Sequence, residues 1–438
     1  MAGGVWTTQN KVRPGIYINF VNDGGSIGVM GERGTTSIAL PLSWGPAKQL
    51  LRIEAGDNVK DLLGYDMASQ QLLLVREALK RASTLLLYRL NVGTKASAVI
   101  GALTATAVHG GERGNDLSVI VQANIDDSTK FDVTTMLSGE AIETQTVSTV
   151  DELRSNQWVS FSGTGTLTAT AGAALAGGSD GSVTNADHTD FLSALELEDF
   201  QTAALSATDN TLKGVYAAFA RRLRESEGKK IQVVLENYPL ADHEGVISVK
   251  NGVILSDGTR LTAAQATAWV AAATASAGVA ESLTFQSYDD AADALPRYTN
   301  SQTIAALEAG EFVFTASNGQ VIVEQDINSL TSFGGDKGKS FHKNRVVRVL
   351  DGIGNDMKRI FEQYYLGKVS NNADGRNMLK SEIITYLTSL QDSNAIQNFD
   401  PQTDITVQQG ADSDSVTVEA GIQPVDSVEK IYMKVKVK

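Results

Sequence analysis

The carboxyl-terminal segment constrains this chain most, because apolar and basic residues alternate along it. The apolar set is Ile431, Met433, Val435 and Val437, and the basic set is Lys430, Lys434, Lys436 and Lys438. A period of two is typical of a β-strand with one buried face. A single strand at a chain end leaves its backbone N–H and C=O groups unpaired, so it cannot be stable alone. It must pair within its own domain or with the sheet edge of a neighbour, and its lysines disfavour indiscriminate edge pairing.

The amino-terminal end has a similar character. A Pro14-Gly15 break is followed by the strand-like residues Ile16, Tyr17, Ile18 and Phe20. Both strand-like ends are attached through glycine-containing segments. A chain that adds its own strands to the sheets of other copies builds a polymer when the contact is heterologous and does not close. We therefore interpret these four residues and the four apolar residues of the other end as inter-subunit strand arms.

Between the ends, changes in residue pattern predict several domains. A helix is expected at 70–81 and a buried strand at 85–90, whereas residues 96–182 contain short alternating runs rich in Ser, Thr, Ala, Gly and Val. Later segments alternate helical and strand patterns, including a helix at 262–278 that Thr262 could cap. A hairpin is expected around the turn Asn318-Gly319, and helices are expected at 346–361 and 375–390. The predicted class is α/β and α+β multidomain. The predicted parts are an N-terminal arm (1–20), an α/β segment (21–95), an inserted small β-sandwich or barrel (96–182), an α/β domain (183–330) and an α+β C-terminal domain ending in a strand arm (331–438).

Charge and composition exclude some functions. The net charge of −14 disfavours general nucleic-acid binding, which requires positive surface against phosphate. The chain contains no cysteine, which rules out disulfides, thiolate metal sites and cysteine nucleophiles. No apolar run reaches about 18 residues, so no membrane insertion is expected. The first residues also lack the pattern of a secretion signal.

Motifs for catalysis are weak. The glycine-rich stretch at 334–340 ends in Gly-Lys-Ser, but it is one residue shorter than a phosphate-binding loop. The four histidines, His109, His188, His243 and His342, show no metal-ligand spacing, and no Gly-x-Ser-x-Gly turn is present. We expect no catalytic, cofactor-binding or metal-binding residues. An α/β hydrolase or a nucleotide-dependent enzyme remains the main alternative, and a bacterial surface polymer, which the missing secretion signal disfavours, is a third.

A basic cluster lies near the start of the last domain. It consists of Lys337, Lys339, Lys343, Arg345 and Arg348, with no acidic residue between Lys337 and Leu350. Phe341 is the one aromatic residue within it, which is a weak pattern for nucleic-acid binding. An acidic protein partner is an alternative, with charge setting register and association rate. The cluster could also be a solvated helix start.

Three segments of the carboxyl-terminal part carry a family resemblance. Residues 323–331, 343–353 and 372–376, together with Pro14-Gly15-Ile16-Tyr17, resemble the tail sheath proteins of contractile phages. The resemblance is closest to the sheaths of defective prophages and phage-tail-like bacteriocins. It spans nearly the full length and is weakest at 96–182.

The resemblance implies a structural role and no catalysis. Such proteins stack as hexameric rings in a helix around a tail tube, and contraction drives the tube through a cell envelope. Terminal arms of neighbouring subunits complete a small sheet in the C-terminal domain, and the central α/β scaffold is subtilisin-like in fold. The implied partners are neighbouring sheath subunits, the tube protein, and baseplate and tail terminator proteins. The implied location is a virion or bacteriocin tail, assembled in the host cytoplasm, and the basic cluster is expected to face an acidic tube.

Overall fold

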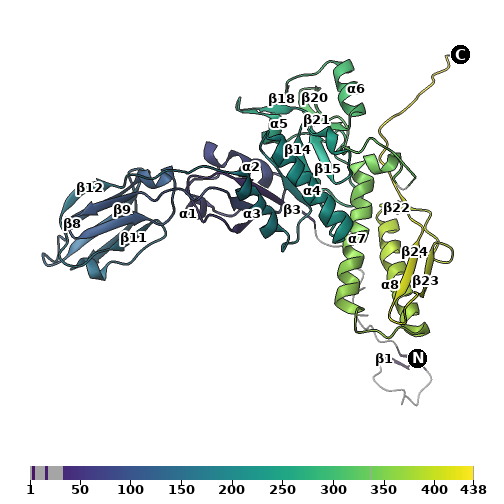
Figure 1. The fold of residues 1–438 in the computed structure, drawn as a ribbon, viewed down its shortest axis with the longest axis horizontal. Coiled ribbons are helices and arrows are strands. Elements are labelled where there is room, and N and C mark those ends of the chain that lie inside the picture. Colours follow the sequence, from purple (N-terminus) through teal and green to yellow (C-terminus); the bar gives the residue numbers. More distant parts are fainter. Residues whose placement is uncertain (1, 5–14, 18–32, 336, 438) are drawn as a thin grey trace. The chain divides into compact units, whose positions relative to one another are not determined.

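The computed structural model describes residues 2–4, 15–17, 33–335 and 337–437 (Figure 1). Two of the predicted arm residues, Ile18 and Phe20, lie outside these ranges. The chain forms two compact units. One, here called the C-terminal unit, contains residues 356–423 and the described part of the first 31 residues. The other, the main unit, contains residues 33–355 and 424–437.

The main unit is built on a seven-stranded sheet. Its strands, in spatial order, are β19 (Glu311–Phe312), β15 (Val246–Val249), β14 (Gln232–Glu236), β13 (Thr202–Ala204), β3 (Thr35–Leu40), β5 (Thr84–Arg89) and β4 (Leu50–Glu54). All neighbours pair in parallel except β4, which runs antiparallel to β5. Every residue of β5 is buried, as expected for a parallel strand covered on both faces. The predicted segments 21–95 and 183–330 thus contribute strands to one sheet.

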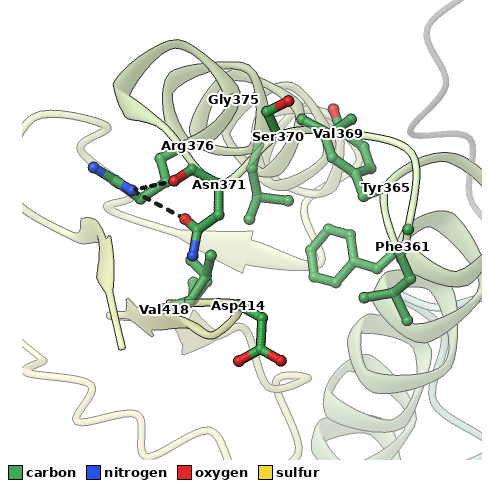
Figure 2. Close-up of a pocket in the computed structure, with 13 residues that line it drawn as sticks. Phe361, Tyr365, Val369, Ser370, Asn371, Gly375, Arg376, Asp414 and Val418 are labelled. Atoms are coloured by element: carbon green, nitrogen blue, oxygen red, sulfur yellow. Dashed lines mark hydrogen bonds between the residues drawn. The ribbon is translucent and has the colours of Figure 1, made fainter. Parts of the chain in front are cut away.

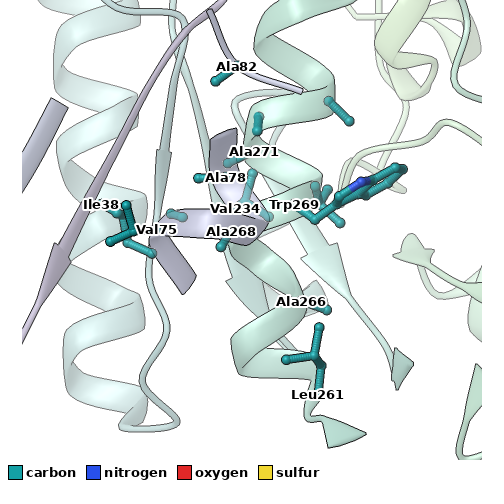
Figure 3. Close-up of a cluster of buried hydrophobic side chains, with 14 of the residues drawn as sticks. Ile38, Val75, Ala78, Ala82, Val234, Leu261, Ala266, Ala268, Trp269 and Ala271 are labelled. Carbon is teal, nitrogen blue, oxygen red and sulfur yellow. The ribbon is translucent and has the colours of Figure 1, made fainter. Parts of the chain in front are cut away.

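Helices cover both faces of this sheet. On one face, α5 (Ala263–Ser276) and α2 (Leu73–Leu79) pack in a core that includes Ile38 (Figure 3). The adjacent Ala39 belongs to the core on the opposite face. That second core is formed with α3 (Asn185–Leu195) and α4 (Asn210–Ser226). The predicted cap of α5 is confirmed, because the Thr262 side chain accepts a hydrogen bond from the Gln265 backbone N–H. The main unit also contains two short helices, α1 (Lys60–Leu63) and α6 (Asn300–Glu308).

Smaller β elements lie beside the central sheet. They are β16 (Gly252–Leu255), β17 (Arg260–Leu261), β18 (Ala291–Leu295) and the hairpin of β20 (Phe314–Ser317) and β21 (Gln320–Val323). The predicted Asn318-Gly319 turn is confirmed, and both residues have positive φ, as a two-residue hairpin turn of this type requires.

The inserted domain is all β, as predicted. One sheet contains β10 (Glu140–Val147), β9 (Phe131–Leu137), β8 (Leu117–Ala123) and β12 (Thr170–Ala174), and the other contains β11 (Val159–Ser162), β7 (Leu103–Ala107) and β6 (Ser97–Ile100). Alternate residues such as Val119 and Val121 fill its core. The buried Arg89 side chain attaches the insertion to the central sheet by donating to the Gly45 and Gly110 carbonyls, both at 2.6 Å.

The helices predicted at 346–361 and 375–390 are confirmed as α7 (Asn344–Tyr364) and α8 (Ala373–Asp392). The short strands are β22 (Ile396–Gln397), β23 (Ile405–Gln409), β24 (Val416–Ala420) and β25 (Gln423–Pro424). At the amino-terminal end, β1 (Ala2–Gly4) pairs in parallel with β2 (Gly15–Tyr17). The strand predicted at 428–437 is wrong for the single chain, because those residues adopt no regular secondary structure.

Trp269 provides a test of the core. Its ring is fully buried, stacks on Tyr288 with ring centroids 4.3 Å apart, and donates to the Asp289 carboxylate at 2.8 Å. Trp269→Ala should cost about 3–5 kcal/mol of unfolding free energy, because it leaves a cavity beneath α5. Guanidinium unfolding followed by circular dichroism measures the loss. Leu240→Ala, at a side chain that is 87% exposed, should change stability by less than about 0.5 kcal/mol. Equal stability of the Trp269→Ala variant and the unaltered protein would contradict this description of the core.

Candidate functional site

The root of the C-terminal arm is anchored by one carboxylate. Glu429 accepts hydrogen bonds from the Thr284 hydroxyl at 2.9 Å, the Gln325 amide at 2.6 Å and the Lys343 ammonium. Its side chain is 11% exposed. Burial by itself would raise the pKa of Glu429, but the donors from Lys343, Gln325 and Thr284 outweigh it and hold the pKa below the usual 4.5. The anchor fixes the point at which the arm leaves the rest of the main unit.

Beyond this anchor the arm is exposed. Ile431, Met433, Val435 and Val437 are 79%, 80%, 75% and 94% exposed, respectively. No described strand pairs with residues 426–437. The arm therefore carries the side-chain alternation of a half-buried strand without the partner strand that would bury one face.

The C-terminal unit contains a sheet of two described strands with an apolar groove beside it. β23 and β24 pair antiparallel, with Val407 opposite Val418 and Thr406 opposite Glu419. Val416 and Val418 of β24 line a cavity of about 280 Å³ together with Phe361. Figure 2 shows Val418 and Asp414 on one side of this groove and Phe361 and Tyr365 on the other. Val418 is 40% exposed, so β24 presents apolar surface as well as strand backbone that no other described strand pairs with.

The amino-terminal arm is described in part. Ile16 and Tyr17 lie in β2, where they pair with Gly3 and Gly4 of β1. Their strand conformation agrees with the prediction, but their partner is another segment of the same chain. Ile18 and Phe20 lie outside the described residues.

The predicted basic cluster is not one exposed surface. Arg348 has a side chain that is 1% exposed, donates to the Glu281 carbonyl and forms an ion pair with Asp326 at 3.4 Å. Lys337 binds both oxygens of Glu244 at 2.9 Å, and Lys343 binds Glu429. The expectation that all five residues face a tube is wrong, because Arg348 is inside the main unit and two lysines are already paired.

Of the remaining two basic residues, Lys339 is exposed and Arg345 is half-buried. Arg345 therefore offers less surface than the sequence indicated, and Lys339 is the member of the cluster that is both exposed and outside the ion pairs described above.

The acidic partners of this cluster were missed because they come from distant segments. Another buried pair has the same character: Arg224 of α4 forms a bidentate pair with Asp351 of α7, at 2.6 and 2.7 Å. Glu244 lies 3.7 Å from the same guanidinium. No local spacing links these residues, so the sequence alone carried no signal for them.

The histidine rings sit in structural contacts. His188 contacts the Tyr216 hydroxyl at 3.0 Å, His243 contacts Glu225 at 3.1 Å, and His342 contacts the Leu330 carbonyl at 2.6 Å. Burial lowers the pKa of all three, and that of His109 to about 4. Within the described ranges no serine hydroxyl contacts a histidine ring, and no group of three or more His, Asp or Glu side chains could hold a metal ion. In the same part of the chain, no helix has the length and apolar character to cross a membrane.

Comparisons with known proteins identify the family. Four consecutive segments match phage tail sheath domains: the Gp18 domain III N-terminal region (33–90), the beta-sandwich domain (91–180), the central domain (181–329) and the C-terminal domain (336–438). The chain is also 62% identical to the solved sheath tail protein of Desulfitobacterium hafniense, with a TM-score of 0.89, over 97% of this chain and 100% of that one. The chain belongs to the phage tail sheath family.

Other relatives agree with this assignment. This sheath protein is 40% identical to the phage-like element PBSX protein XkdK of Bacillus subtilis, over the full length of both chains. The helical sheath of the anti-feeding prophage in its contracted state has the same fold, with a TM-score of 0.58 at 13% identity, over 98% of this chain and 100% of that one. The expected resemblance to tail sheath proteins is confirmed.

Removing the charge at Glu429 should release the root of the arm. The sequence contains no cysteine, so Val428→Cys, at a position 83% exposed, accepts a single fluorescent label. Glu429→Gln should lower the anisotropy of this label, because the amide cannot form the ion pair with Lys343. Glu308→Gln is the matched control, since Glu308 is exposed and lines, together with Glu429, a cavity of about 940 Å³. Equal anisotropy in both variants would argue against the anchor.

The same label tests the pH dependence of the anchor. The pKa of Glu429 is lower in the folded chain than in the unfolded chain, so its contribution is fully present above pH 4.5 and is lost as the pH falls through the folded-state value. Anisotropy should stay constant from pH 8 to pH 5 and fall only below about pH 4.5. Circular dichroism at each pH separates release of the arm from unfolding. Release between pH 5 and pH 7 would contradict the assignment.

Proposed function

We propose that this protein is a structural tail sheath subunit that polymerises as hexameric rings in a helix around a tail tube. Contraction of the polymer drives the tube through the envelope of a target cell. The observation that carries the proposal is the combination of an anchored but exposed C-terminal arm with a two-stranded sheet beside an apolar groove. A strand donated by one copy supplies the pairing that the sheet of another copy lacks.

Main-chain pairing suits a polymer whose subunits move relative to one another. Each backbone hydrogen bond contributes only about 0.5–1.5 kcal/mol, but a shared strand forms several of them. The pairing is local to the arm and the receiving sheet. The arm therefore keeps its partner while the rest of the subunit changes its contacts, and the work of contraction comes from new contacts between subunits.

The proposed partners are neighbouring copies of the chain, a tail tube protein, and baseplate and tail terminator proteins. The proposed location is the tail of a virion or bacteriocin particle assembled in the host cytoplasm. Of the five basic residues, Lys339 stays a candidate for a tube contact, because it is exposed. A contact of this type contributes about 0–1 kcal/mol and is sensitive to salt, which suits an interaction that must release.

An enzymatic role is the alternative, and the described residues offer it little support. Lys339 and Ser340, which end the glycine-rich stretch, lie in a 3-10 turn at Lys339–His342, whereas a phosphate-binding loop opens an α-helix. Assays of esterase, protease and ATPase activity separate this alternative from the structural role.

Deleting residues 430–438, which keeps Glu429, should leave a folded subunit that forms no tubes. The expected readouts are an unchanged circular dichroism spectrum, a monomer in sedimentation velocity, and no hollow striated tubes in negative-stain microscopy. Deleting residues 1–20 should have the same effect. The matched control for the first deletion is a chain in which residues 430–438 are present in scrambled order. This variant keeps the charge and length of the arm but removes its alternation. Tubes formed by either deletion variant would refute the arm model.

A further inference from the structure

We propose that the lysine face of the C-terminal arm is recognised by acidic residues along strand β24 of a second copy, so that charge selects the partner in addition to backbone pairing. This inference rests on the proposed exchange of strands between copies. It goes further by naming the receiving edge and the side chains that recognise the arm.

Charge is strongly uneven along the last part of the chain. From residue 381 to residue 429 the chain has no lysine or arginine and nine acidic residues: Glu382, Asp392, Asp400, Asp404, Asp412, Asp414, Glu419, Asp426 and Glu429. Asp412, Asp414 and Glu419 lie in or next to β24 and are exposed. Their carboxylates form no ion pair with any described residue. The receiving sheet therefore presents negative charge that its own chain does not neutralise.

The arm has the opposite charge and is equally uncompensated. Lys430, Lys434 and Lys436 are exposed and form no ion pair within the described part of the chain. They follow the acidic stretch directly in sequence, and the arm holding them is not paired with any described strand. One chain thus contains an unpaired basic arm and an unpaired strand edge with acidic side chains. Together they favour a second copy of the chain as the partner.

The two-residue periods of the arm and the sheet agree. Val416 and Val418 of β24 line the apolar groove, so Thr417 and Glu419 point to the opposite face of the sheet. When a strand pairs with β24, side chains that lie directly opposite each other point to the same face of the sheet. When the apolar face of the arm covers the groove, its lysines fall on the side of Glu419. A register shift of one residue would place lysines in the groove, so this arrangement also specifies register.

The edge of β24 fits the arm better than the edge of β23. The groove is lined by residues of β24 together with Phe361, Tyr365 and Leu366, and no residue of β23 contributes to it. Asp414 and Glu419 lie in β24 or within two residues of it, whereas Asp404 is the acidic residue within two positions of β23. Both the apolar surface and the negative charge therefore gather at β24.

An exchange of charges tests the pairing. The arm variant carries Lys434→Glu and Lys436→Glu, and the sheet variant carries Asp412→Lys and Glu419→Lys, at two positions that do not line the groove; all four positions are exposed. Each variant alone should raise the protein concentration needed for tube formation at least about tenfold, because attraction becomes repulsion. The chain with all four changes should form tubes close to the original concentration. Sedimentation and negative-stain microscopy measure both effects.

A matched control changes the same number of charges elsewhere. Lys95→Glu with Arg154→Glu alters two exposed residues, one directly before the inserted β domain and one within it, and should leave tube formation unchanged. The pairing is refuted if the arm variant assembles like the unaltered protein. It is also refuted if both variants fail but the combined chain is not rescued.

A peptide experiment separates this inference from the proposed function. The probe is a fluorescein-labelled peptide of residues 427–438, and the acceptor is the full-length arm variant, whose β24 is unaltered. Binding should weaken at least about tenfold when the acceptor also carries the sheet changes, and it should weaken with added salt. If the unaltered protein forms no tubes but the peptide binds in this charge-dependent way, the sheath proposal fails and the pairing stands. Equal binding to both acceptors would overturn the pairing.

Discussion

The backbone hydrogen-bonding groups of the C-terminal arm are the constraint on which the proposed assembly depends. The arm has the alternation of a strand, yet its apolar side chains are 75–94% exposed in the single chain. Strand backbone without a partner is satisfied by water alone, and its apolar face gains nothing from burial. A second chain that offers a strand edge and an apolar groove meets both needs. In the proposed polymer, the energetically incomplete parts of this protein are the parts that join copies together.

The rest of the chain is built to hold these parts in place. The central sheet is covered on both faces, and the buried Arg89, Arg224 and Arg348 side chains join segments that are distant in sequence. Removing one partner of such a buried pair is costly, so these contacts keep the main unit rigid. Glu429 extends the same principle to the arm, because three donors from three other segments hold its carboxylate. In the proposed polymer, a rigid anchor followed by an exposed arm lets force on one copy reach the next through a short connection.

The sequence predicted features that depend on local signals. The capping Thr262, the Asn318-Gly319 hairpin and the alternating strands of the inserted domain are each encoded within a few residues, and each was confirmed. Strand β13 was missed because its three residues are strand only between β3 and β14, which come from distant segments. The basic cluster was misinterpreted for the same reason. The run lacks acidic neighbours in sequence, but Asp326, Glu244 and Glu429 reach it in the fold.

The most direct test of the account is a disulfide formed between two copies, since the chain has no cysteine of its own. One preparation carries Val435→Cys in the arm and the other carries Val418→Cys in β24. The two are mixed, allowed to assemble and then oxidised. Paired strands bring facing Cα atoms within the range of about 4.4–6.8 Å that a disulfide requires. The account predicts a covalent dimer in the mixture that forms in neither preparation alone. Absence of this dimer from well-formed tubes would contradict the donation of the arm to a neighbouring sheet.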